Sequence, residues 1–202
     1  MKVELKTKQT LKGKGEAIGF SFSEDLKVSL FWSSKTDLDL CLFYRKKEGG
    51  VGGVFAEKYR NRKDDMGSLN KFPFIELIKD QNQPEEDNEA EEQIFIRNLD
   101  EIDEAYIVVI NYNSAKENKN VTFADEGGRI ELKTHEGAFL EVRADSEAPG
   151  FVYCVCYIKN VDGENTLIKC GGDEMHPEVM DLETAFKKIP GFSKICKKVE
   201  LR

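Results

Sequence analysis

Hydrophobic and polar residues alternate along much of the chain with the period of two that is typical of sheet strands. The clearest case is the segment 27–32, in which Val28, Leu30 and Trp32 share one face. Less regular runs predict one or two short strands near the N-terminus and further strands at 37–44, 54–59, 72–78, 93–98, 121–128, 129–137 and 138–150. Glycine, proline and aspartate punctuate these runs, so the rhythm is that of an all-β protein.

Two segments are almost continuously apolar instead. The run 105–113 predicts a buried central strand, and the run 151–159 predicts a strand that is buried on both faces. Strict alternation along 151–159 would place Cys154 and Cys156 on the same face. The run 151–159 and the shorter run 165–170 flank Asn-Val-Asp-Gly, which is a strong signal for a tight hairpin.

Near the C-terminus the period changes to that of a helix. One helical stripe contains Val179, Leu182, Ala185, Phe186 and Ile189. Pro177 suits a first helical turn, and Pro190 with Gly191 ends the helix. We therefore expect a single domain over residues 1–202, with one short C-terminal helix at about 177–189.

Four connections are expected to lack strands. They are a glycine-rich loop at 46–53, a polar connection at 60–70, an acidic turn or short helical segment at 99–105, and a polar loop at 114–120. Pro73 cannot donate a hydrogen bond to a neighbouring strand, so 72–78 is expected at a sheet edge or with Pro73 at its entry.

Composition narrows the possible partners and location. The 202 residues carry a formal net charge of −8, which argues against sequence-independent binding to nucleic acid or anionic lipid, because a basic face drives both. Cations or basic partners fit better. The sequence has neither the apolar run of a signal peptide nor an apolar stretch of about 18 residues that could enter a membrane. Its five cysteines, an odd number, lack the spacing of a disulfide framework. We expect a cytoplasmic protein with reduced, mostly buried thiols.

Little in the sequence points to catalysis. The two histidines, His135 and His176, are not surrounded by a nucleophile motif, and no phosphate loop or dinucleotide fingerprint is present. Zinc-type ligands are offered by Cys154, Cys156, Cys170 and His176, but a Cys-x-Cys pair within a strand lacks the turn spacing of structural zinc sites. We expect a protein without enzymatic activity and thiols that pack in the core.

The segment 80–96 carries the main candidate chemistry. A long acidic loop without a basic residue runs directly into an apolar strand. Its carboxylates repel one another, so either water solvates the loop or a cation organises it. Asp37 and Asp39 form a second acidic pair on one face at the start of a strand, which is unfavourable unless it is exposed or shares a cation. Calcium prefers such oxygen ligands.

The order of these features resembles the TerD-type tellurium-resistance and stress-response family. The resemblance rests on a strand ending in Trp32, the sequence TDLDLCLF at 36–43, Gly67 with Ser68, the acidic loop ending in EEQIFI, and the strand YIVVINY. It covers about the first 170 residues, and the final hairpin and helix agree with it. The resemblance implies a β-sandwich of two mainly antiparallel sheets that binds calcium.

The resemblance also implies a set of metal ligands. Asp37 and Asp39 match the family's Asp-Leu-Asp pair. Asn82 matches an asparagine at the start of the family's acidic loop, and Glu91 with Glu92 matches the acidic pair that closes the loop. With two further acids that could be recruited, the candidate ligands are Asp37, Asp39, Asp80, Asn82, Asp87, Glu91 and Glu92. Family glycines and two carboxylates of the loop are replaced, so weak calcium binding is expected.

Two functions fit this sequence. In the first, calcium orders the acidic loop as a surface for other proteins of a stress-response assembly. In the second, the chain is a divergent interaction module of the same fold that has lost the metal. The sequence does not specify the oligomeric state.

Overall fold

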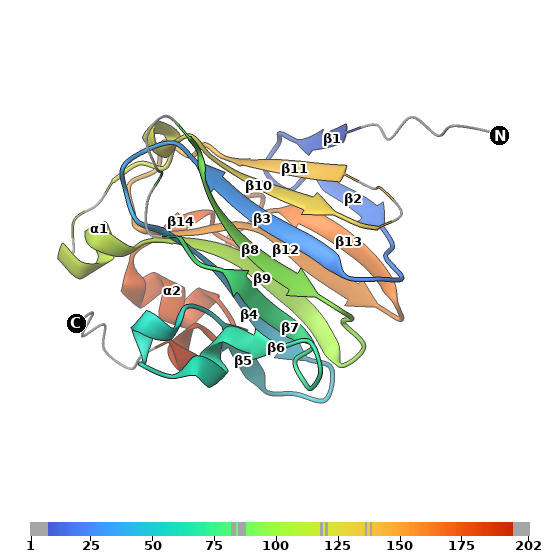
Figure 1. Cartoon of the computed structure of the whole chain (residues 1–202). Coiled ribbons are helices and arrows are strands. Elements are labelled where there is room, and N and C mark those ends of the chain that lie inside the picture. Colours follow the sequence, from blue (N-terminus) through green and yellow to red (C-terminus); the bar gives the residue numbers. More distant parts are fainter. Residues whose placement is uncertain are drawn as a thin grey trace.

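Two sheets packed face to face form the body of the protein (Figure 1). The structure is a computed structural model that describes residues 8–81, 84, 88–117, 119, 121–135, 137 and 139–195. Within these residues each sheet is a path of hydrogen-bonded strands, and β1 and β11 alone pair in parallel. The expected fold class, a β-sandwich of mainly antiparallel sheets with a short C-terminal helix, is confirmed.

Sheet A runs in the order β1 (Lys8–Leu11), β11 (Phe139–Ala144), β10 (Gly128–Lys133), β3 (Leu26–Trp32), β8 (Ala90–Ile96), β7 (Ile75–Lys79) and β6 (Gly67–Ser68). Sheet B runs in the order β2 (Ala17–Phe20), β13 (Glu164–Lys169), β12 (Val152–Val161), β9 (Ile102–Asn111), β4 (Leu38–Lys46) and β5 (Val51–Val54), and β14 (Val179–Met180) pairs with β12. The helices are α1 (Tyr112–Glu117) and α2 (Leu182–Lys188), with short 3₁₀ turns at η1 (Glu57–Tyr59), η2 (Lys63–Met66), η3 (Ala124–Glu126) and η4 (Phe192–Lys194). None of the helices in the described part of the chain is long and apolar enough to cross a membrane.

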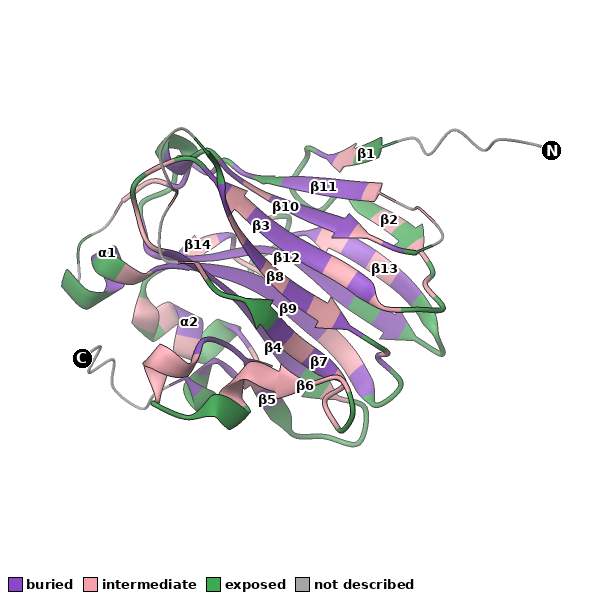
Figure 2. Cartoon of the chain, viewed as in Figure 1, coloured by how far each residue is buried: buried purple, intermediate pink, exposed green. Residues whose placement is uncertain are grey.

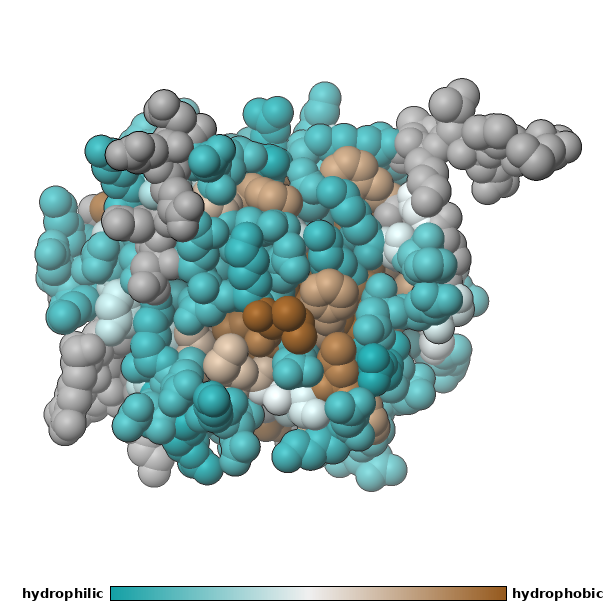
Figure 3. Space-filling view, viewed as in Figure 1, coloured by the Kyte–Doolittle hydropathy of each residue, from teal (hydrophilic) through white to brown (hydrophobic). Residues whose placement is uncertain are grey.

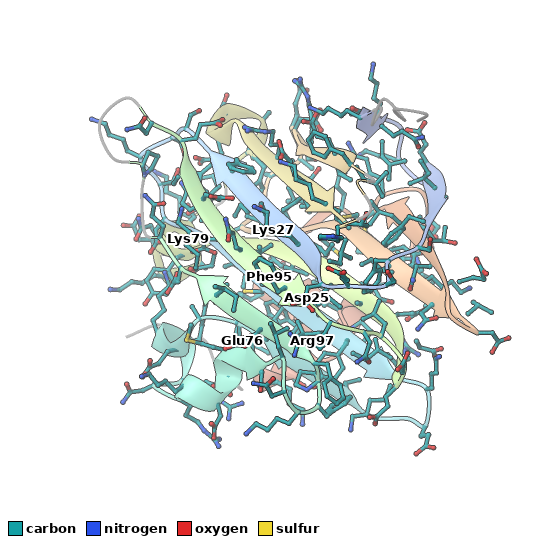
Figure 4. The ribbon with its side chains drawn as sticks, turned by 45° about the vertical axis from the view of Figure 1, so that its right-hand side comes forward. Asp25, Lys27, Glu76, Lys79, Phe95 and Arg97 are labelled. Atoms are coloured by element: carbon teal, nitrogen blue, oxygen red, sulfur yellow. The ribbon has the colours of Figure 1, made fainter. Side chains whose placement is uncertain are left out.

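Sheet A buries one face and exposes the other. Val28, Leu30 and Trp32 face the core, as the alternation predicts. On the outer face, Phe95 of β8 lies in register between Lys27 of β3 and Glu76 of β7 (Figure 4). This face is mainly hydrophilic, with a small group of hydrophobic side chains near β7 and β8 (Figure 3). The alternating strands therefore belong to the sheet that meets water on one side.

The central strands of sheet B, β4, β9 and β12, are buried on both faces, whereas β2 and β13 at one edge carry exposed residues (Figure 2). The inner face of sheet B packs against sheet A, and its outer face is covered by α2 and the segment that follows it, through Ala185, Ile189, Phe192 and Ile195. This arrangement explains why the runs 105–113 and 151–159 are apolar without alternation. β9 lies between β4 and β12 and is the central strand that its sequence predicts.

The predicted hairpin joins β12 to β13. Asp162 and Gly163 at its tip have φ angles of 51° and 88°, in the left-handed region that the favoured two-residue turns require. The expectation that Cys154 and Cys156 share a face is wrong. The register with β9 shifts between them, and this irregularity sends Cys154 to the outer cluster and Cys156 to the inner core.

The expected strand at 54–59 is also wrong. The strand lies earlier, at β5, which begins within the segment expected to be a loop and ends at Val54, and η1 follows it. Gly52 and Gly53 pair with Tyr44 and Phe43 of β4. A Cβ atom at Gly52 would lie 2.2 Å from the Tyr44 hydroxyl oxygen, and one at Gly53 would lie 2.6 Å from the Phe43 ring. The glycines form a strand because the aromatic rings of β4 fill the space of their side chains.

Smaller differences arise from local pairing. Residues 179–180 form β14 rather than the start of a helix, because they pair with β12. Asp181 then caps the N-terminus of α2, since its carboxylate accepts a hydrogen bond from the Thr184 amide at 2.8 Å. Strand β9 begins within the expected acidic turn, α1 replaces part of the expected polar loop, and η3 replaces the expected strand at 121–128. Pro73 precedes β7, at the entry to the strand.

Substitution of Gly53 by alanine is expected to destabilise the protein by about 1–3 kcal/mol, the usual cost of overpacking. The Phe43 ring cannot withdraw easily, since it packs against Phe55 and Phe192 with ring centroids 6.0 and 5.2 Å away. Denaturant unfolding of Gly53→Ala and wild type measures the change. Gly19→Ala is the control, because nothing lies within 4 Å of its new Cβ. Equal stability of both variants would contradict this explanation of β5.

Candidate metal centre

Three carboxyl groups from separate parts of the chain meet at one end of the sandwich. They belong to Asp39 of β4, Asp80 just after β7, and Glu92 of β8, and one oxygen from each lies within 4.8 Å of the others. Asp39 and Glu92 are 0% and 1% exposed, whereas Asp80 is exposed and forms the mouth of the group. We call these three residues the acidic centre.

The sheet edge brings the centre together. Strand β5 pairs with the segment 42–45 of β4, so among the described residues the start of β4 has no strand partner on that side. There the Leu40 amide donates to Glu92 Oε2 at 2.5 Å. The Gln81 amide donates to Glu92 Oε1 at 3.3 Å, and Gln81 Oε1 accepts from the Glu91 amide at 3.2 Å. Glu92 therefore joins the two sheets and also holds the base of the acidic loop.

Burial makes this concentration of charge unfavourable. Burial raises the pKa of the Asp39 carboxyl, and the neighbouring Asp37 charge adds to the rise. Burial, the Asp39 charge and the hydrogen bond with Asp80 together raise the pKa of Glu92 well above its usual range. Two like charges about 4 Å apart repel by about 4 kcal/mol at an effective dielectric constant near 20. The centre therefore favours a bound cation or a shared proton.

A lysine supplies one positive charge to this region. The Lys58 ammonium lies 2.7 Å from Asp39 Oδ1 and 3.0 Å from Asp37 Oδ2, and it sits 4.5 Å from the centroid of the Tyr112 ring. The Tyr59 hydroxyl donates to Asp39 Oδ2 at 2.5 Å. Burial alone would lower the pKa of Lys58, but the two aspartates hold it above its ordinary value. Lys58 thus partly neutralises the acidic centre from within the chain.

Sequence analysis does not identify Lys58 and Tyr59 as site residues. Both lie in η1, where a strand was expected, and both reach β4 across about twenty positions of sequence. The segment around them has no motif that marks a charged site. Only the fold shows that η1 lies over the unpaired start of β4.

The structure separates the seven predicted ligands. Asp39, Asp80 and Glu92 form the acidic centre, and Asp37 shares the Lys58 ammonium with Asp39. Glu91 points to the outer face of sheet A, where its carboxylate is 3.3 Å from Lys79 and 3.8 Å from Lys27. Asn82 and Asp87 lie outside the described residues.

The acidic centre fits a hard metal ion. Calcium takes oxygen ligands at about 2.3–2.6 Å, so two ligands of one ion are separated by at most about 5 Å. The 4.8 Å spread of the three carboxylate oxygens lies within this limit. Although Lys58 is close, Asp39 Oδ1 makes no hydrogen bond of good geometry within the described structure. Three carboxylates leave positions for carbonyl or water ligands, since calcium binds six to eight oxygens.

The fold is a divergent β-sandwich of the TerD-like type. One solved structure with this fold is the crystal structure of a homologue of the telluride resistance protein TerD, SCO6318 from Streptomyces coelicolor A3(2), with 12% identity, a TM-score of 0.56, and coverage of 82% of this chain and 95% of that one. A second is a protein of unknown function, SAV2460, with 14% identity, a TM-score of 0.54, and coverage of 80% and 94%. No protein-family model and no curated protein sequence matches the chain.

Replacement of Lys58 by methionine is expected to destabilise the metal-free protein by about 3 kcal/mol, because it leaves the buried Asp39 carboxylate without its ion-pair partner. The double variant Lys58→Met/Asp39→Asn is expected to recover much of this loss, since both charges are then absent. Denaturant unfolding of wild type, Lys58→Met, Asp39→Asn and the double variant at pH 8 completes this double-mutant cycle. Lys79→Met removes a surface ion pair and serves as the control, with an expected change of under about 1 kcal/mol. Additive effects of the two substitutions would show that the pair is not coupled.

Proposed function

We propose that this protein is a non-enzymatic cytoplasmic module that binds calcium at the acidic centre and thereby orders the acidic loop for contact with other proteins of a stress-response assembly. The observation that carries the proposal is the buried carboxyl group of Glu92, held beside Asp39 and Asp80 within the reach of a single ion. The TerD-like fold supports the same proposal.

The position of the centre supports a link between the ion and the loop. Asp80 lies where the chain leaves β7, and Glu92 lies near the start of β8, so an ion held by both would tie the two ends of the loop together. Binding to the folded state alone stabilises that state in proportion to the logarithm of the ion concentration. The ordered loop would present a strongly acidic surface, which is complementary to a basic protein partner.

The ligand set favours calcium over magnesium. Calcium accepts irregular geometry and carboxylates from a flexible loop, whereas magnesium requires a near-ideal octahedron and gives up its water reluctantly. The centre combines two buried carboxylates fixed by strands with an exposed one that follows a strand. Such an arrangement suits the more adaptable ion.

Calcium is expected to raise the melting temperature of the chelator-treated protein, and magnesium at equal ionic strength is expected to do so much less. At a calcium concentration of a hundred times Kd, the stabilisation is about 2.7 kcal/mol. For a chain of this size that corresponds to a rise of about 5–10 °C in differential scanning calorimetry. The same rise with both ions would indicate charge screening, and the absence of a rise would refute calcium binding.

Two adjacent glutamates provide a matched pair of variants for this measurement. Glu92→Gln keeps an acceptor for the Leu40 amide but removes a ligand charge, so the calcium response is expected to disappear. Glu91→Gln makes the same chemical change on the outer face of sheet A, so the calcium response is expected to remain. Equal responses from these two variants would place the ion elsewhere.

One observation favours a second candidate function, a metal-free interaction module. The Lys58 ammonium already occupies the space between Asp37 and Asp39, so a cation belonging to the chain itself stabilises part of the acidic region. In that case the acidic loop acts as a solvated surface for partners and needs no ion.

Calcium titration of Lys58→Met separates the two candidates. If the centre binds metal, removal of the Lys58 ammonium frees the Asp37 and Asp39 carboxylates and removes a positive charge that repels calcium. The calcium affinity is then expected to increase by tenfold or more. If the module is metal-free, isothermal titration calorimetry is expected to detect no calcium binding in wild type or variant. Weaker calcium binding in the variant than in wild type would contradict competition by Lys58.

A further inference from the structure

A cavity of about 560 Å³ lies at the opposite edge of the sandwich, lined by residues of β1 and β11 of sheet A and by the end of β13 of sheet B. It shares no lining residue with the acidic centre. Its charged lining residues are Lys8, Lys12, Arg143, Lys169, Glu141 and Asp145. Four cations and two carboxylates give this cavity a formal excess of two positive charges, on a chain with a net charge of −8.

Lys169 is the unusual member of this group. Its side chain is only 3% exposed, although lysine is rarely buried. Both backbone groups of Lys169 are held by the neighbouring segment, because its amide donates to the Glu16 carbonyl oxygen at 3.0 Å and its carbonyl oxygen accepts from the Gly15 amide at 2.9 Å. The ammonium group is therefore held at the cavity by the sheet and not by a mobile surface chain.

The contacts of this buried ammonium within the protein are weak. Its nitrogen lies 3.3 Å from Asp145 Oδ1 and 3.5 Å from the Arg143 carbonyl oxygen, and the Asp145 side chain is 58% exposed. Strong hydrogen bonds from an ammonium to an oxygen anion are about 2.7–2.9 Å long. Burying an ammonium without such bonds is costly. Lys169 therefore keeps hydrogen-bonding capacity for a group in the cavity.

The other charged groups leave this capacity in place. Glu141 is buried and forms ion pairs with two cations. Its carboxylate contacts the Lys8 ammonium directly and lies 3.9 Å from Arg143 Nε. Glu16 also acts electrostatically on Lys169, but its carboxylate accepts hydrogen bonds from the Lys12 and Gly13 amides. The two lining carboxylates balance only half of the cationic charge around the cavity.

We propose that this cavity binds a small multivalent oxyanion, a molecule that carries phosphate or several carboxylate groups. Lys169 anchors the anion at the base of the cavity, and Arg143, whose side chain is 70% exposed, supplies a planar guanidinium at its mouth. The volume lies within the range of about 300–1,000 Å³ that is usual for small-molecule sites and exceeds the needs of a single phosphate ion. The bound anion would supply the short contacts that the buried ammonium lacks.

Isothermal titration calorimetry of the full chain with pyrophosphate and with citrate tests the proposal. Both anions chelate calcium, so the protein is first freed of divalent ions and dialysed at fixed ionic strength. Saturable binding of one anion per chain is expected. Binding of pyrophosphate alone would assign the site to phosphate groups, binding of citrate alone would assign it to carboxylates, and binding of both would assign it to oxyanion charge in general.

Three variants locate the binding site. Arg143→Gln changes a side chain that is 70% exposed and is expected to weaken binding about tenfold. Lys169→Met is expected to abolish binding, and its circular dichroism spectrum verifies that it folds. Lys159→Met removes an exposed lysine of β12 outside the cavity and is expected to bind as wild type does. Lack of binding by wild type, or equal affinity of wild type and Arg143→Gln, would overturn the proposal.

Discussion

The burial of the central strands of sheet B, β4, β9 and β12, on both faces is the constraint on which the rest of the structure depends. Sheet A covers one face, and α2 with the segment up to Ile195 covers the other. Strands in such a sheet must be apolar along their whole length, and every polar group in them must find a partner. Strands β9 and β12 are largely apolar, and their buried Asn111 and Asn160 side chains are hydrogen-bonded. Asp39 in β4 is a buried carboxylate, and its partners shape one end of the molecule.

Those partners explain why η1 has its place in the fold. A buried carboxylate is stable only when it is hydrogen-bonded and neutralised. Tyr59 and Lys58 reach Asp39 from η1, and Glu92 reaches the neighbouring Leu40 amide from sheet A. The charge on Asp39 thus fixes η1 against β4, while Glu92 links β4 to the other sheet. The same contacts that satisfy one buried group gather the carboxylates of the acidic centre.

The sequence predicts those parts of the fold in which local pattern and tertiary environment agree. The alternation of β3, the apolar run of β9 and the Asp162-Gly163 turn each contain their own signal. Prediction fails where a distant partner decides the structure. Gly52 and Gly53 are typical of a loop, but the rings of Tyr44 and Phe43 complete their strand. The irregular pairing beside Cys154 likewise depends on β9 and leaves no trace in the composition of β12.

The same distinction applies to the charged sites, which lie toward opposite edges of the sandwich and have opposite signs. The acidic residues of the loop are conspicuous in sequence, yet the centre depends on two of them and on Asp39, while Glu91 faces away. Lys169 is one of thirty basic residues and has no motif; only its burial distinguishes it. In both sites the low dielectric of the interior strengthens each unmatched charge. Selective ion binding can therefore arise at either edge of a protein whose remaining surface charges are largely screened by water.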